Sequence, residues 1–339
     1  MTELPTLTKK DFTSDQEVRW CPGCGDYAIL ATMQGLLPKL GIAPENTVFV
    51  SGIGCSSRFP YYMNTYGFHT IHGRAPAIAS GLAAARPDLN VFVVTGDGDA
   101  LSIGGNHLIH ALRRNINLTI LLFNNEIYGL TKGQYSPTSP VGTHTKSTPM
   151  GSIDWPLNPI SLGLGAEASF VARTIDTDRK HLQEVIIRAF EHRGSSLVEI
   201  LQNCVVFNDD AFLPLTDPTT RAINQIRLVE GKPIVFGPDG ENSVCQRPDG
   251  GIEIVPTAAA GDRVLVHSPR RGDPSLAFSL SRLIPNGSGK GPTPIGVFRE
   301  VDRPVYEDLM SIQLDQAVAT KGRGDLSVLL GSGATWDVD

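Results

Sequence analysis

The sequence predicts an α/β fold built on a parallel, twisted sheet with flanking helices. Residues 47–50, 90–95 and 118–123 are continuous apolar runs, which are typical of strands buried on both faces. Helical patterns separate these runs, and strand–helix–strand alternation favours a parallel sheet with right-handed crossovers. Each run ends in a polar turn rich in Gly or Asn. Because ligands of open parallel sheets bind at the carboxyl ends of the strands, these turns are expected to share one site.

The elements alternate regularly from residue 21 to residue 211, which predicts a core domain at 21–211. Residues 1–20 are polar and predict an extended N-terminal extension. Apolar residues at helical spacing predict a helix over 27–40, and Gly41 ends it. The other expected elements are a strand at 47–50, helix at 75–85, strand at 90–95, helix at 105–114, and strands at 118–123 and 169–173, followed by a helix at 178–193 and a strand at 197–201.

Two segments lack this regular alternation. Residues 126–160 are irregular and rich in Ser, Thr, Pro and Gly. A loop of that length inside a domain is usually functional, so it is expected to contribute to a site. Residues 212–339 show a weaker pattern and predict a C-terminal extension with a few short strands and helices.

Composition and charge exclude several classes of protein. The 339 residues include 35 Gly and 24 Pro, and 41% of the residues are hydrophobic, which excludes a disordered chain. The net charge of −6 argues against nucleic acid or an anionic membrane as the main partner. No apolar run approaches the roughly 20 residues that span a bilayer, and no leader-like segment precedes the core, so we expect a cytoplasmic, reducing location.

A Gly-Asp-Gly turn at Gly96, Asp97 and Gly98 predicts a phosphate and magnesium site. Glycines let the backbone approach a ligand closely, and a following helix offers N–H groups to an anion. Asn125 follows the next strand, which returns the chain beside Asp97. A carboxylate, an amide oxygen and a backbone carbonyl are ligands that Mg²⁺ accepts. The Gly-Asp-Gly turn by itself is equally typical of a plain turn.

Five cysteines in a reducing location are not expected to form disulfides. Cys21 and Cys24 form a Cys-x-x-Cys loop, and Cys55 and Cys204 each follow a predicted strand. Four thiolates can hold either Zn²⁺ or an iron–sulfur cluster, and spectator thiols are the third interpretation. Cys245 belongs to no motif and is expected to be a free thiol.

These motifs, taken together and in this order, resemble the β subunits of 2-oxoacid:ferredoxin oxidoreductases. The resemblance covers about residues 18–210. It is carried by Cys21-Pro22-Gly23-Cys24-Gly25, Gly52-Ile53-Gly54-Cys55-Ser56-Ser57, Ile71-His72-Gly73-Arg74-Ala75, Gly96-Asp97-Gly98-Asp99-Ala100, the run from Phe123 to Gln134, and Asn203-Cys204. The fold that it implies is the thiamine diphosphate-binding fold.

The resemblance implies a role for particular residues. Mg²⁺ would be bound by Asp97, Asn125 and the carbonyl of Ile127, and one [4Fe–4S] cluster by Cys21, Cys24, Cys55 and Cys204. Thiamine diphosphate would contact Ile53, Gly54, Cys55, Ser56, His72, Gly96, Gly98, Asp99, Gly129 and Leu130. His72, Arg74, Leu130 and Lys132 would act at the catalytic and substrate end. From the residues alone, the favoured interpretation of His72 is an ordinary hydrogen-bonded loop histidine, and Lys132 can be a solvated charge.

The implied activity is oxidative decarboxylation of a 2-oxoacid with coenzyme A. The segments 57–62 and 131–139 resemble the 2-oxoglutarate branch, which forms succinyl-CoA and CO₂ and passes electrons through the cluster to ferredoxin. The implied partner is an α subunit that supplies the activating Glu, in a dimer of heterodimers. Two alternatives stay open: the same chemistry on pyruvate or another 2-oxoacid, with Arg58 as one source of the additional cation that 2-oxoglutarate needs, and a non-catalytic, zinc-stapled interaction subunit.

Overall fold

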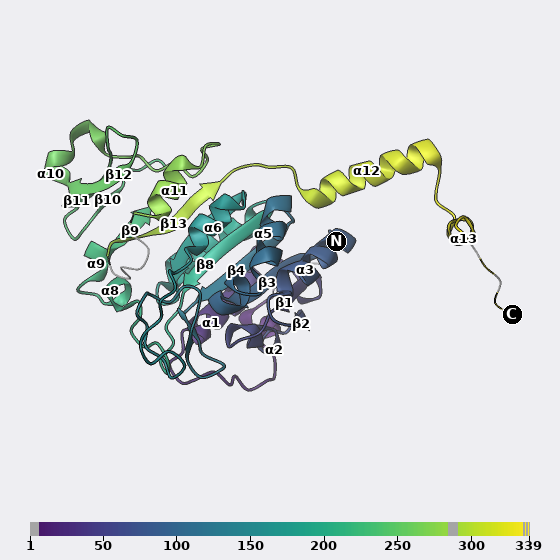
Figure 1. Ribbon diagram of the computed structural model, residues 1–339, viewed down its shortest axis with the longest axis horizontal. Helices are drawn as coiled ribbons and strands as arrows, with labels where there is room; N and C mark the ends of the chain where they lie inside the picture. Colours follow the sequence, from purple (N-terminus) through teal and green to yellow (C-terminus); the bar gives the residue numbers. More distant parts are fainter. Residues whose placement is uncertain (1–6, 284–290, 335, 337, 339) are drawn as a thin grey trace.

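An eight-stranded sheet in the order β2-β1-β3-β4-β8-β7-β13-β9 forms the centre of the computed structural model (Figure 1). The structure describes residues 7–283, 291–334, 336 and 338. Neighbouring strands run parallel, except that β13 is antiparallel to β7. The strands are β1 (Thr47–Ser51), β2 (Tyr66–His69), β3 (Asn90–Gly96), β4 (Leu118–Asn124), β7 (Phe170–Ile175), β8 (Ser195–Leu201), β9 (Gln225–Leu228) and β13 (Thr293–Glu300). The expected α/β class with a mainly parallel sheet is confirmed.

Helices cover both faces of this sheet. One face packs against α3 (Ala75–Ala85), α5 (Gly105–Arg114), α6 (Pro159–Gly165) and α11 (Ser275–Ser281). The other face packs against α1 (Asp26–Leu36), α2 (Phe59–Tyr62) and α7 (Arg179–Glu191). The short helix α4 (Asp97–Leu101) follows β3 directly, within the Gly-Asp-Gly motif. The three layers leave the carboxyl ends of the parallel strands at one edge of the sheet.

The continuous apolar runs are explained by burial on both faces. In β4, Ile120 and Leu122 point into the core on one side, whereas Leu121 and Phe123 point into the core on the other. All four side chains are at most 1% exposed. Because successive side chains of a strand point to opposite faces, every position must be apolar when both faces are covered.

The core elements end at slightly different residues from those expected. Helix α1 stops at Leu36, and residues 37–40 continue as a 3₁₀ turn because Pro38 has no N–H to donate. Asp178 is the N-cap of α7 and accepts a hydrogen bond from the His181 N–H, so it precedes the helix. The loop at 126–160 contains a small hairpin of β5 (Ile127–Tyr128) and β6 (Gln134–Tyr135).

The C-terminal extension contributes to the main sheet, which the sequence pattern does not predict. Strands β9 and β13 both come from residues after 212, and β13 pairs with β7 of the core. The short helices α8 (Leu213–Thr216) and α9 (Arg221–Asn224) precede β9. Between β9 and β13 lie a three-stranded antiparallel sheet of β10 (Val235–Phe236), β11 (Asn242–Gln246) and β12 (Ile252–Pro256), and the short helix α10 (Thr257–Ala260). Cys245 lies in β11 and is fully buried.

Beyond the sheet, α12 (Tyr306–Lys321) and α13 (Leu326–Gly331) project from the body as an arm (Figure 1). Contacts at its base fix its direction: Glu307 is buried and accepts from the Asn117 N–H, and Arg193 pairs with Asp308 at 2.5 Å. None of the helices in the described part of the chain is long and apolar enough to cross a membrane.

The two-sided core predicts that truncation in β4 is costly. Leu121→Ala should lower the free energy of unfolding by about 2–5 kcal/mol, because it leaves a cavity in a fully buried site. The matched control is Leu326→Ala, since Leu326 is 69% exposed and its truncation should change stability by less than about 1 kcal/mol. Urea unfolding of both variants measures the difference, and equal losses would contradict this account of the core.

Candidate active site

A pocket lies at the carboxyl edge of the sheet, beside β1, β3 and β4. Its lining comes from four chain segments: the loop after β1, a loop before α3, the motif after β3 and the hairpin after β4. The lining residues are Ile53, Gly54, Cys55, Ser56, His72, Gly96, Asp97, Gly98, Asp99, Phe123, Asn125, Ile127, Tyr128, Gly129, Leu130 and Thr131. All ten residues expected to contact thiamine diphosphate, and the three expected to bind Mg²⁺, line this one pocket.

Asp99 holds two of these loops against β3. Its buried carboxylate accepts hydrogen bonds from the backbone N–H groups of Ile53 at 3.1 Å and Gly73 at 2.8 Å. The hydroxyl of Thr95 donates to the other oxygen at 2.7 Å. A Cβ on Gly52 would lie 1.8 Å from that same oxygen, which explains the glycine at this position. Asp99 therefore positions the walls of the pocket.

Asp97 and Asn125 bring oxygen ligands together in the pocket. Burial raises the pKa of Asp97, which is only 2% exposed, so its ionised form needs a compensating positive charge. The amide nitrogen of Asn125 donates to Gln202 at 2.9 Å, and its oxygen accepts from the Ile127 N–H at 3.2 Å. This donor set of carboxylate, amide and carbonyl oxygens fits Mg²⁺.

Gly98 makes room for an aromatic wall of the pocket. A Cβ on Gly98 would lie 2.2 Å from the Tyr128 ring, so any larger residue would displace that ring. The Tyr128 hydroxyl donates to the Gly98 carbonyl at 2.9 Å. The hairpin after β4 is thereby attached to the motif after β3.

The residues expected at the catalytic end divide into two groups. His72 and Leu130 line the pocket, and the His72 ring lies 3.4 Å from the Asp99 carboxylate. Arg74 lies at the start of α3 and approaches the His72 carbonyl at 3.4 Å, outside the pocket lining. Lys132 is exposed on the hairpin turn with a φ of 75° and does not line the pocket. The structure therefore groups only His72 and Leu130 with the cofactor residues.

Four of the five cysteines gather beside this pocket. A Cβ on Gly129 would lie 3.5 Å from Cys55 Sγ and 3.7 Å from Cys204 Sγ, so these two thiols are neighbours. The Cys-x-x-Cys loop is tied to the same place, because Gln202 donates to Cys24 Sγ at 3.2 Å and the Trp20 indole donates to the Cys55 carbonyl at 2.7 Å.

Burial and nearby acidic groups disfavour ionised thiols in this cysteine cluster. Burial, followed by the charge of Asp26, raises the pKa of Cys55 to about 12 and that of Cys24 beyond its usual range. Cys204 contributes to both shifts. Asp26 is itself buried beside Cys24, and burial raises its pKa to about 7. Metal coordination supplies the charge that ionises such thiols.

Zinc and an iron–sulfur cluster would use the same four thiols, so the arrangement of these side chains bears on both alternatives equally. Within the residues that the structure describes, no group of three or more His, Cys, Asp or Glu side chains is arranged to hold a metal ion. The fifth thiol, Cys245, lies apart in β11, and burial raises its pKa.

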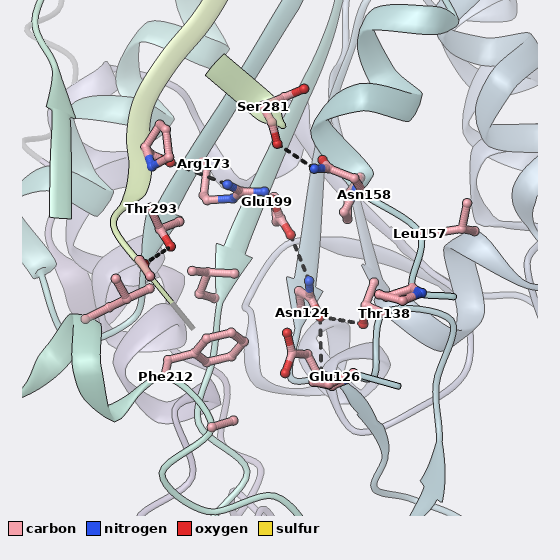
Figure 2. Close-up of a pocket in the computed structure, with 18 of the residues that line it drawn as sticks. Asn124, Glu126, Thr138, Leu157, Asn158, Arg173, Glu199, Phe212, Ser281 and Thr293 are labelled. Atoms are coloured by element: carbon pink, nitrogen blue, oxygen red, sulfur yellow. Dashed lines mark hydrogen bonds and ion pairs between the residues drawn. The ribbon is translucent and has the colours of Figure 1, made fainter. Parts of the chain in front are cut away.

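A second cavity of about 160 Å³ lies between the core and the C-terminal extension (Figure 2). Thr138 joins the two sites, because its hydroxyl lies 2.6 Å from the Asp97 carboxylate and 2.9 Å from the Asn124 side-chain oxygen. Asn124 donates to Glu199 at 2.7 Å, and Arg173 pairs with Glu199 at 2.6 Å. This chain of polar contacts is buried and holds Asp97 in one orientation.

Sequence reasoning did not single out these supporting residues. Thr138 lies in the quoted run 131–139, yet nothing in its neighbours along the chain indicates a contact with Asp97. Arg173 and Glu199 are the charged residues of strands whose other residues are apolar or carry a hydroxyl group. That pattern is the one available signal, since a buried charge in a strand requires a partner.

Comparison with known proteins agrees with this geometry. The family "Thiamine pyrophosphate enzyme, C-terminal TPP binding domain" matches residues 52–200. The 2-oxoglutarate oxidoreductase subunit KorB of Mycobacterium tuberculosis is 60% identical over 97% of this chain and 88% of that protein. The 2-oxoacid:ferredoxin oxidoreductase 1 subunit beta of Aeropyrum pernix is 48% identical over 56% of this chain and 60% of its own length.

A solved structure extends the similarity to nearly the whole fold. The 2-oxoglutarate:ferredoxin oxidoreductase from Magnetococcus marinus, with 2-oxoglutarate, coenzyme A and succinyl-CoA bound, superposes with a TM-score of 0.76 at 31% identity. The match covers 98% of this chain and 98% of that one. With a thiamine pyrophosphate-binding core and a relative 60% identical over nearly its full length, this chain belongs to the β subunits of the 2-oxoacid:ferredoxin oxidoreductases.

Proposed function

We propose that this chain is the β subunit of a 2-oxoglutarate:ferredoxin oxidoreductase. The reaction converts 2-oxoglutarate, coenzyme A and two oxidised ferredoxins into succinyl-CoA, CO₂, two reduced ferredoxins and one proton. The observation that supports this most strongly is the convergence of two donor sets at one edge of the sheet. Cys55 connects the two, because it lines the pocket that holds the oxygen ligands and neighbours Cys204.

In this proposal the pocket binds thiamine diphosphate and Mg²⁺. Asp97, Asn125 and the carbonyl of Ile127 would hold the metal, and Gly54 and Gly96 leave space for the diphosphate. When bound, the cofactor supplies a nucleophilic carbon and an electron sink for decarboxylation of the 2-oxoacid. The residues of this chain position it, since Asp99 fixes the pocket walls and Thr138 fixes Asp97.

The cysteine cluster would hold one [4Fe–4S] cluster through Cys21, Cys24, Cys55 and Cys204. Such a cluster transfers one electron at a time. Gln202 supports the site from two sides, since it donates to Cys24 Sγ and accepts from Asn125. One side chain thus connects the proposed electron-transfer ligands with the proposed magnesium ligands, which favours direct transfer between the two cofactors. We place the enzyme in the cytoplasm, because thiolate ligands need a reducing environment.

A complete active site requires the α subunit in this proposal. The carboxylate that activates the cofactor in this family comes from that subunit, so the isolated β chain should be inactive. The exposed apolar residues beside the pocket fit coverage by a partner, since Ile71 is 69% exposed and Leu130 is 50% exposed. The working assembly would be a dimer of two αβ pairs.

The substrate proposal is 2-oxoglutarate, the substrate in the names of the M. tuberculosis and M. marinus relatives. Pyruvate is the second candidate, because the pocket lining of this chain contains no Lys or Arg to bind a second carboxylate. Arg58 donates to the Arg19 carbonyl at 3.3 Å and does not line the pocket. The cation for that carboxylate would therefore come from the α subunit or from a rearranged loop.

The αβ complex, reconstituted without oxygen, tests the substrate directly. The kcat/KM for coenzyme A-dependent reduction of methyl viologen should be at least about tenfold higher with 2-oxoglutarate than with pyruvate. Pyruvate lacks the second carboxylate, so it leaves a cationic group of the site unpaired. Equal or greater turnover of pyruvate would transfer the proposal to the second candidate. Iron and sulfide analysis of the same preparation should find about four of each per β chain.

Thr138 should be needed for tight binding of the cofactor. Thr138→Val removes the hydrogen bond to Asp97, and loss of such a supporting contact weakens metal binding by about 10–100-fold. Thr138→Ser keeps a hydroxyl and should restore affinity to within about threefold. Titration of the complex with Mg²⁺ and thiamine diphosphate, followed by intrinsic fluorescence, measures both variants. Equal affinities for the Val and Ser variants would contradict the role of this hydroxyl.

The cysteines should divide sharply in their effect on iron content. Cys24→Ser removes one of the four clustered thiols, so the complex should lose cluster iron and the reduction of ferredoxin. Cys245→Ala is the matched control, because Cys245 lies in β11, away from the other thiols, and its iron content should be unchanged. Metal analysis and the visible absorption spectrum measure both. Retention of full iron by Cys24→Ser would remove Cys24 from the ligand set.

A further inference from the structure

A groove of about 520 Å³ opens beside the Cys-x-x-Cys loop. It shares no lining residue with either cavity described above. Its floor and walls come from the cysteine loop, the start of α1 and the turn before α7: Pro22, Gly23, Cys24, Gly25, Tyr27, Ala28, Asp176, Thr177, Arg179 and Asn203. Two of the clustered thiols therefore line different cavities: Cys55 lines the cofactor pocket and Cys24 lines this groove.

This arrangement separates the entry of electrons from their exit. Cys55 lines the cofactor pocket, where electrons arise in the proposed reaction. Cys24 lines the groove, and Cys21 in the same loop is exposed. A cluster held between these thiols would be accessible to a second redox centre from the groove side, without passage through the pocket.

The surface of the groove suits a small protein that docks transiently. Pro22, Gly23 and Ala28 give a shallow apolar floor without long side chains, and the Tyr27 ring is 36% exposed beside them. Weak electron-transfer complexes use small interfaces of this kind, below about 1,200 Å².

The charges around the groove favour an acidic partner. Arg179 is exposed and has no ion pair among the described residues, and the next residue, Lys180, is 4.0 Å from Glu184. The N-termini of α1 and α7 both lie at the groove, and Asp26 and Asp178 occupy these two helix ends. The acidic group within the groove lining, Asp176, is buried and accepts from the Asn203 N–H. Within the groove lining Arg179 is the exposed charged side chain, whereas the exposed acids Glu17, Glu184, Asp209 and Asp210 lie outside the lining.

We propose that this groove is the docking site of the ferredoxin that accepts the electrons, with Arg179 pairing with an acidic residue of the ferredoxin. The inference rests on the proposed function and extends it by assigning the face of the β subunit that the acceptor contacts. Docking there places the acceptor's own cluster next to the Cys21–Cys24 loop. Small dyes do not need this surface, because they reach the thiol loop by diffusion.

A pair of charge reversals at adjacent residues tests this docking site. Arg179→Glu changes the groove, whereas Lys180→Glu makes the same charge change one residue outside the lining. Both residues are exposed at the start of α7, where a Glu is favourable for the helix, so both variants should fold. Thr177→Trp is a third variant that fills the groove with an apolar ring.

Two measurements on the cofactor-loaded αβ complex separate docking from catalysis. Binding of a purified low-potential bacterial [4Fe–4S] ferredoxin is measured by biolayer interferometry, and steady-state reduction is measured with that ferredoxin and with methyl viologen. For Arg179→Glu and Thr177→Trp, Kd and KM for ferredoxin should rise by about fivefold or more, because rim charges and shape control association. Lys180→Glu should stay within about twofold, and viologen reduction should be unchanged in all three.

The outcomes distinguish failure of this inference from failure of the proposed function. Unchanged ferredoxin binding by Arg179→Glu and Thr177→Trp, or equal effects of Arg179→Glu and Lys180→Glu, would overturn the docking site. Loss of viologen reduction in parallel with ferredoxin reduction would also overturn it, since the variants would then act on catalysis. A wild-type complex that reduces no viologen with any 2-oxoacid would instead count against the proposed function.

Discussion

The buried carboxylate of Asp99 is the contact on which the arrangement of the pocket depends. It accepts two backbone N–H groups, from Ile53 and Gly73, and a hydroxyl from Thr95. A buried carboxylate without hydrogen-bond partners would destabilise the fold. The loops that supply the donors are therefore held in place, because moving them away would leave Asp99 without partners. The close approach leaves no room for a Cβ at Gly52. Loops from separate parts of the chain thereby become one wall.

Asp97, two residues earlier, differs from Asp99 because hydrogen bonds from the protein compensate its burial only in part. Its carboxylate is buried with a raised pKa, and Thr138 and Ser136 lower that pKa only in part. A divalent cation would offset the remaining free-energy cost of keeping this buried carboxylate ionised. The polar chain through Asn124 to Glu199 keeps Asp97 oriented for that ion. One motif therefore contains a carboxylate that completes the fold and another that remains available for a ligand.

The cysteine loop shows how a redox site is assembled from segments distant in sequence. Gln202 follows β8, donates to Cys24 and accepts from Asn125, so the ends of two adjacent parallel strands position both donor sets. The thiols lie between the cofactor pocket and an open groove. The exposed apolar residues of the arm, such as Leu314 and Leu326, indicate that further surface is covered in the complete assembly.

The sequence by itself determined the parallel sheet, the position of its turns and most of the pocket. Doubly buried strands must be apolar throughout, and parallel strands bring their carboxyl ends to one edge, so local pattern is sufficient for Asp97, Asn125 and Cys55. Only the tertiary structure decided that Thr138 supports Asp97 and that β13, from beyond residue 212, joins the core sheet. Those contacts join residues far apart along the chain. No periodic pattern in the neighbouring sequence marks these residues, because a single polar contact or strand pairing depends on how the chain packs in three dimensions.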